Sequence, residues 1–126
     1  PAQPFRKARE RKRSCRGVIL DAIFGIGLSR NVEGAYRKLI RWINGQEDMK
    51  VIAVDVPSGI SSDNGSVMGD AVRADVTVTF GEKKLGQVLF PGRELCGHLL
   101  VKDVALCQRA AQNGKNMSRC WIGKIF

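Results

Sequence analysis

Two carboxylates stand where short apolar runs end, and this placement is the clearest chemical signal in the chain. Asp21 follows the apolar residues 18–20, and Asp55 follows the apolar residues 51–54, after which the chain turns through Pro-Ser-Gly at 57–59. Buried parallel strands deliver their last side chains to one edge of the sheet, and open α/β sheets bind ligands at that edge. The two carboxylates, the Ser58 hydroxyl and the glycine-rich loop after Asp21 therefore predict a small-molecule site.

The two carboxylates would repel each other in a shared crevice unless a proton or a cation lay between them. A hard cation with oxygen ligands would satisfy both, with Ser58 and backbone carbonyls completing its shell. For Asp21 or Asp55 alone, a turn or a helix cap is an equally good interpretation. The pair, taken together with the loop and the Pro-Ser-Gly turn, favours a ligand site.

The loop Gly25-Ile26-Gly27 would let a ligand approach the backbone closely, and its N–H groups would favour anionic oxygen. It is not the dinucleotide fingerprint G-x-G-x-x-G, because Arg30 occupies the place of the last glycine. Lys84 is a further candidate for a polar contact, whereas Thr77 and Thr79 are expected on the outward-facing surface of a strand.

The elements that must position these groups alternate between strand and helix. Apolar runs predict strands over 18–22, 51–56 and 76–80, and an apolar stripe with helical spacing predicts a helix over 32–44, ended by Gly45. Strand, helix and strand in this order imply a right-handed βαβ unit with parallel strands. The loop 81–86 is expected to carry Lys84 back over the sheet edge. Short strands are expected at 88–90 and 99–101, with turns at 91–93 and 96–97.

Composition excludes several classes of protein. The 126 residues carry a net charge of +9, but this charge is concentrated in 1–17 and 107–126, and the part between them is nearly neutral. This distribution argues against a nucleic-acid-binding domain and favours a solvated, disordered basic arm. No apolar run approaches the roughly 20 residues of a membrane span.

The cysteines and the histidine carry little chemical signal. The four cysteines show no C-x-x-C spacing, which fits free thiols in a reducing, cytoplasmic compartment. The lone His98, between a glycine and a leucine, is expected at a strand edge rather than as a ligand or base.

Three motifs in natural order carry a family resemblance. They are residues 21–30 (DAIFGIGLSR), residues 55–60 (DVPSGI) and residues 74–86 (ADVTVTFGEKKLG). Together they resemble the NAD(P)H-hydrate epimerase domain, the YjeF N-terminal domain, over about 18–104. The resemblance implies an α/β, Rossmann-like three-layer αβα fold with a mostly parallel sheet, truncated at its N-terminal side. It divides the chain into a basic arm (1–17), a partial domain (18–106) and an unassigned tail (107–126).

The family interconverts the R and S epimers of NADHX and NADPHX, in which the nicotinamide ring is hydrated at C6. The resemblance implies that Asp21 and Ser58 are potassium ligands, and we assign the proton transfer to Asp55, since a positioned carboxylate suits general acid–base catalysis. It implies that the substrate contacts Asp55 and the loop residues Gly25, Ile26, Gly27, Leu28, Ser29, Arg30 and Asn31. The partners implied are a second copy of the chain and an ADP- or ATP-dependent dehydratase, fused or separate.

One family motif has no counterpart here. The family's Asn-Asn-Gly-Gly-Asp, which supplies another potassium ligand and binds phosphates, has no match upstream of Val18. A catalytically inactive fragment and a binding or scaffold module of the same fold therefore stay open beside the enzyme.

Overall fold

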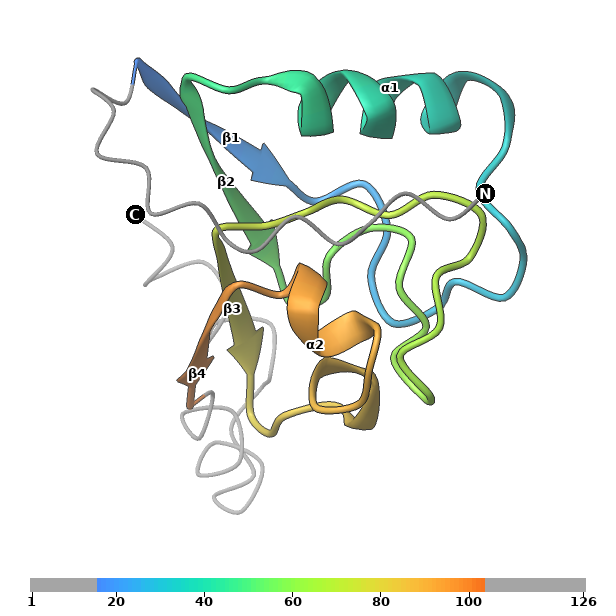
Figure 1. Ribbon diagram of the computed structural model, residues 1–126. Helices are drawn as coiled ribbons and strands as arrows, with labels where there is room; N and C mark the ends of the chain where they lie inside the picture. The colour runs from blue at the N-terminus through green and yellow to red at the C-terminus, as the bar shows by residue number, and fades with distance from the viewer. Residues whose placement is uncertain (1–15, 104–126) are drawn as a thin grey trace, which may run out of the picture.

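The computed structural model describes residues 16–103, and these form an α/β unit around a parallel sheet (Figure 1). The basic arm expected at 1–17 lies almost wholly outside these residues, and the tail expected at 107–126 lies wholly outside them. None of the helices within residues 16–103 has the length and hydrophobicity of a membrane span.

The sheet has four strands in the order β1-β2-β3-β4, and every neighbouring pair is parallel. The strands are β1 (Gly17–Asp21), β2 (Met49–Val54), β3 (Val76–Phe80) and β4 (His98–Lys102). The helical elements are α1 (Gly34–Gly45), the 3₁₀ helix η1 (Leu85–Gln87) and the short α2 (Gly92–Leu95). The predicted α/β class and the parallel βαβ unit are therefore confirmed.

One face of the sheet carries the core. Ile40 and Ile43 of α1 pack in one cluster with Val51 of β2, and Ile19 of β1 borders this cluster. The segment around α2 covers the same face farther along, because the Thr77 hydroxyl of β3 donates to the Cys96 carbonyl at 2.7 Å. Both helices thus cover the same face of the sheet, the one to which Val51 and Thr77 point, since side chains alternate between faces along a strand.

The opposite face has no helical cover among residues 16–103. Its apolar side chains are aligned by the strand register, with Leu20 opposite Ile52 and Ile52 opposite Val76. Leu20 is 67% exposed and Phe80 is 42% exposed. Purely parallel sheets are normally covered on both faces, so this part of the chain holds two of the three expected layers.

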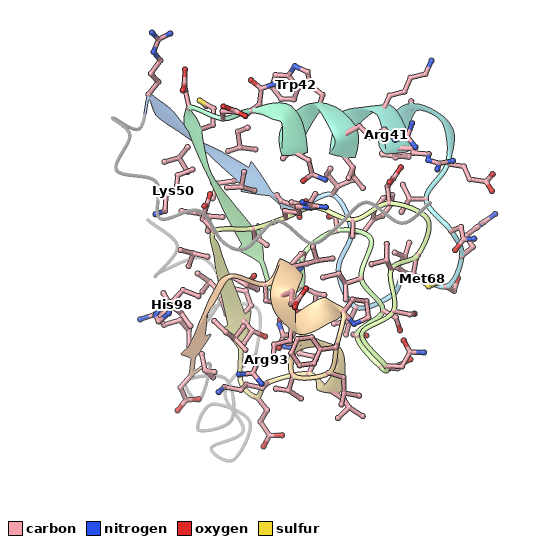
Figure 2. The ribbon with its side chains drawn as sticks, viewed as in Figure 1. Arg41, Trp42, Lys50, Met68, Arg93 and His98 are labelled. Carbon is pink, nitrogen blue, oxygen red and sulfur yellow. The ribbon has the colours of Figure 1, made fainter. Side chains whose placement is uncertain are left out.

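The short strand predicted at 88–90 is wrong. The N–H groups of Val88 and Leu89 both bond to the Leu85 carbonyl at 3.1 Å, so these residues close the turn of η1 instead of pairing with a strand. The turn predicted at 91–93 falls largely within α2. The strand predicted at 99–101 is present as β4, and Figure 2 shows the exposed His98 at its start, at the edge of the sheet as expected.

Candidate functional site

Asp21 joins the end of β1 to the turn after β2. It is the last residue of β1 and is 1% exposed. Its Oδ1 accepts the Ser58 hydroxyl at 2.6 Å, and its Oδ2 accepts the Ser58 N–H at 2.7 Å. The Phe24 N–H in turn donates to Ser58 Oγ at 2.9 Å. The two residues predicted as potassium ligands are therefore in direct contact, and they hold the start of the glycine loop.

Asp55 follows β2 immediately and has a left-handed backbone, with φ at 68°. Few residues other than glycine adopt this region, and aspartate is among the more tolerant. The Asp55 N–H bonds to the Val78 carbonyl at 2.7 Å, which turns the residue toward β3. Its side chain consequently reaches the end of β3 and the loop beyond it, where Lys84 lies.

The Asp55 carboxylate forms an ion pair with Lys84. Its Oδ1 accepts Lys84 Nζ at 2.5 Å and the Thr79 hydroxyl at 2.9 Å, with a longer contact from the Phe80 N–H at 3.4 Å. Burial alone would raise the pKa of Asp55, but these hydrogen bonds and the charge of Lys84 outweigh burial and lower the pKa below its usual value. Asp55 is therefore ionised at neutral pH.

The outward orientation predicted for Thr77 and Thr79 is wrong. Both are fully buried, because the register of β3 puts them on the face that the helical segments cover. Thr79 there bridges two charged groups, as its hydroxyl donates to Asp55 and accepts from Lys84 Nζ at 2.9 Å. The expectation that the loop after β3 carries Lys84 back over the sheet edge is confirmed.

Gln87 is a site residue that the sequence did not reveal. Its Nε2 donates to the Asp55 carbonyl at 2.5 Å, and its Oε1 accepts the Lys84 N–H at 2.7 Å. Gln87 is 2% exposed. Its two hydrogen bonds fasten the loop that carries Lys84 to Asp55, the ion-pair partner of Lys84. No sequence signal marks it, because its role depends on the turn of η1.

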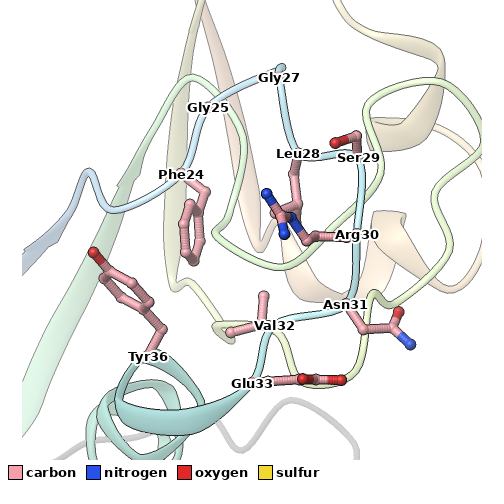
Figure 3. Close-up of a pocket in the computed structure, with 10 residues that line it drawn as sticks. All are labelled: Phe24, Gly25, Gly27, Leu28, Ser29, Arg30, Asn31, Val32, Glu33 and Tyr36. Carbon is pink, nitrogen blue, oxygen red and sulfur yellow. The ribbon is translucent and has the colours of Figure 1, made fainter.

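The glycine loop lines an open cavity of about 440 Å³ between β1 and α1 (Figure 3). Of the residues predicted to contact a substrate, Gly25, Gly27, Leu28, Ser29, Arg30 and Asn31 line it, together with Phe24, Val32, Glu33 and Tyr36. Ile26 is 61% exposed and does not line it, and neither does Asp55. The Phe24 and Tyr36 rings meet edge to face, with centroids 5.0 Å apart, and form its apolar wall.

Neither Gly25 nor Gly27 is required by packing within residues 16–103. A Cβ built on either would meet nothing within 4 Å, and neither has a positive φ. Gly59 differs, because its φ is 97° and a Cβ there would meet the Asp70 carbonyl at 2.0 Å. The expectation that Gly59 is a turn residue is confirmed, whereas the loop glycines leave open backbone beside the cavity.

The donor set around Asp21 fits a hard monovalent cation. The Phe24 carbonyl oxygen lies 3.4 Å from Ser58 Oγ, so a carboxylate, a hydroxyl and a carbonyl come together. Each retains a lone pair beyond its hydrogen bonds. Among the described residues no three His, Cys, Asp or Glu side chains gather, so this set does not suit a transition metal.

The cation expected between the two carboxylates is not needed to relieve repulsion. Asp21 is bound by Ser58, and Asp55 is paired with Lys84. The two acids therefore have separate partners along one edge of the sheet.

The sequence is similar to a known family and to several named proteins. The profile of the family described as YjeF-related protein N-terminus matches residues 3–86. The chain is 54% identical over 88 residues to a protein of Thermofilum pendens named bifunctional NAD(P)H-hydrate repair enzyme Nnr. It is 52% identical over 86 residues to an NAD(P)H-hydrate epimerase of Limosilactobacillus fermentum, and 43% identical over 89 residues to one of Oenococcus oeni.

These alignments cover about 70% of this chain but a smaller part of each relative. The share is 17% for the Thermofilum protein, 41% for the Limosilactobacillus protein and 42% for the Oenococcus protein. The chain thus spans about two fifths of the length of the epimerases that it matches.

Proposed function

Because this chain belongs to the family described as YjeF-related protein N-terminus, we propose that it supplies part of the catalytic site of an NAD(P)H-hydrate epimerase. The observation that carries the proposal is the strand-end group of Asp21, Ser58 and Asp55 beside a glycine loop. The substrates are the R and S epimers of NADHX and NADPHX, which differ in configuration at C6 of the hydrated nicotinamide ring.

Asp55 is the residue that transfers the proton in this proposal. Because Asp55 is ionised at neutral pH, its carboxylate first takes up a proton from solvent and then passes it to the C6 hydroxyl. The hydroxyl leaves as water while the ring nitrogen lone pair forms the C6–N1 double bond. Water then adds to the other face of C6, the electron pair returns to nitrogen, and the Asp55 carboxylate takes back a proton. A positioned acid–base group of this kind contributes about 10²–10⁴-fold to the rate.

The loop 25–31 binds the rest of the substrate. Its glycines leave backbone open to a ligand, since neither is required by packing among the described residues. The cavity beside them combines an apolar wall of Phe24 and Tyr36 with the Arg30 guanidinium, which Figure 3 shows on the cavity side next to Leu28. An aromatic wall and a cation suit a nucleotide, because its base stacks and its phosphates are anionic.

Asp21 and Ser58 hold a potassium ion in this proposal, with the Phe24 carbonyl as a third ligand. A bound monovalent cation supplies positive charge beside the anionic substrate without acting as an acid or a base. Asp21 also keeps a structural role, because it binds both the N–H and the hydroxyl of Ser58.

The relatives' names and the exposed surface support two partners in this proposal. A dehydratase on the same or a separate chain would consume the S epimer, and the Thermofilum relative is named as a bifunctional repair enzyme. The open sheet face and the β1 edge favour a second copy of the chain. The free, buried Cys96 supports a reducing, cytoplasmic compartment.

The test is epimer exchange with the purified chain. (R)-NADPHX is incubated with the chain in potassium or sodium buffer, and the epimers are separated by chromatography. We expect exchange above the spontaneous rate, faster in potassium and lost in Asp55→Ala. A folded chain that leaves the spontaneous rate unchanged in both buffers would contradict the proposal and favour the inactive fragment or the scaffold module.

A further inference from the structure

The Asp55 carboxylate is held by one oxygen only. Lys84, Thr79 and the Phe80 N–H all contact Oδ1. Within residues 16–103 no hydrogen bond reaches Oδ2, and the side chain is 22% exposed. One oxygen is thus anchored, and the other remains open toward solvent at the sheet edge, where ligands bind in open α/β sheets.

The Lys84 ammonium is fully occupied in holding this arrangement. It donates to Asp55 Oδ1, to Thr79 Oγ1 at 2.9 Å and to the Phe80 carbonyl at 3.0 Å. An ammonium has three N–H donors, so these acceptors use all of them. Lys84 therefore has no donor left for a substrate while the ion pair is intact.

The surrounding groups fix the position of the pair from two elements, β3 and η1. Thr79 is fully buried on β3, and Gln87 of η1 holds both the Lys84 N–H and the Asp55 carbonyl. On the β1 side, the strand-end acid Asp21 is bound to Ser58 and makes no hydrogen bond or ion pair with Asp55 or Lys84 among residues 16–103. Among the groups in hydrogen-bond contact with the Asp55 carboxylate, Lys84 is the only charged one that the described residues show.

We propose that Lys84 is a positioning residue that anchors Asp55 through Oδ1, and that Oδ2 is the atom that exchanges the proton with the C6 hydroxyl. The inference rests on the proposed function for its second half. The anchoring of Asp55 by Lys84 concerns the ion pair alone and can be measured without substrate.

The first measurement is the titration of the Asp55 carboxyl by carbon-13 NMR, with the signal assigned through Asp55→Asn. Lys84→Met removes the ammonium and keeps most of the stem, and Lys83→Met is the matched control because Lys83 is an exposed neighbour with the same charge. We expect the pKa of Asp55 to rise in Lys84→Met and to stay at the wild-type value in Lys83→Met. Equal titration curves in the two variants would overturn the ion-pair half of the inference.

Thr79→Val is a second variant for the case in which Lys84→Met does not fold. It removes one donor to Oδ1 with little change of shape. We expect it, too, to raise the pKa of Asp55, by less than Lys84→Met. An unchanged pKa in this variant would argue against the anchored oxygen.

The second measurement is steady-state epimerisation. If Lys84 positions Asp55, Lys84→Met lowers kcat by about 10²-fold with KM within about two-fold, and Lys84→Arg restores part of kcat. A raised pKa of Asp55 with unchanged kcat in Lys84→Met would overturn the positioning role. An inactive wild type whose Asp55 still titrates as expected would instead reject the proposed function and leave the ion pair established.

Discussion

Asp21→Asn is the substitution whose cost follows most directly from the structure. The buried carboxylate accepts two short bonds, from the Ser58 hydroxyl at 2.6 Å and from the Ser58 N–H at 2.7 Å. In Asn one of the two oxygens is replaced by an NH2 group, so the remaining oxygen accepts the Ser58 N–H, the NH2 donates to the Ser58 hydroxyl oxygen, and both bonds become neutral. A hydrogen bond to a charged group contributes about 1.5–3 kcal/mol and a neutral one about 0.5–1.5 kcal/mol, so each bond loses about 1 kcal/mol. We therefore expect the free energy of unfolding to fall by about 2 kcal/mol.

Asp21→Ala is expected to cost more than Asp21→Asn. It leaves both Ser58 donors buried without this acceptor, at about 1–3 kcal/mol each, for a total of about 4 kcal/mol. This is a large fraction of the roughly 5–15 kcal/mol that stabilises a typical domain. A free energy of unfolding that falls in the order wild type, Asp21→Asn, Asp21→Ala would indicate a carboxylate that acts as a buried hydrogen-bond acceptor.

The assay is urea unfolding at neutral pH, followed by far-ultraviolet circular dichroism. Asp63→Asn is the control, because it makes the same change of charge on an exposed residue of the turn at 62–64, away from Ser58. Its expected effect is within about 0.5 kcal/mol. If Asp21→Asn were as stable as Asp63→Asn, the inferred charge-assisted bonds to Ser58 would be refuted.

Three further predictions concern other parts of the fold. Burial raises the pKa of the Cys96 thiol from 9.0 to about 11, so the unfolded chain loses this proton first and the free energy of unfolding falls as the pH rises through this interval. The urea midpoint should therefore depend less on pH in Cys96→Ala than in the wild type. An equal pH dependence in the two proteins would contradict the raised pKa. The added Cβ of Gly59→Ala would meet the Asp70 carbonyl, so this variant should lose about 3 kcal/mol of stability or fail to fold. Gly27→Ala is the control and should melt at the wild-type temperature, and equal melting temperatures of the two variants would argue against the strained turn. Leu20→Lys, at a side chain 67% exposed on the open sheet face, should reduce self-association in sedimentation velocity with little change in stability, and an already monomeric wild type at high concentration would contradict this role.

Much of the fold was predictable because its signals are local. The apolar runs that end at Asp21 and Asp55 predicted β1 and β2, and helical spacing predicted α1 within two residues of its observed start. Once parallel strands are placed side by side, their ends must meet at one edge, so the approach of Asp21 to the Ser58 turn also followed from sequence.

What sequence reasoning missed depends on which face of a strand is covered. The alternation at Thr77 and Thr79 fits either face, and only the contact of β3 with the segment around α2 decides that the threonines are buried. The hydrogen bond from Gln87 to the Asp55 carbonyl depends on the single 3₁₀ turn η1. The apolar run at 88–90, directly after this turn, predicted a strand instead.

The most direct test of the proposed function is oxygen exchange at C6 during epimerisation. If Asp55 drives departure and return of the C6 hydroxyl as water, epimerisation in oxygen-18 water should place the label at C6 of the S epimer formed from (R)-NADPHX. We predict labelled product above the spontaneous background with the wild type and with the control Asp63→Asn, and background alone with Asp55→Asn. Epimerisation without label, or an Asp55→Asn variant as fast as the control, would contradict the proposed role of Asp55.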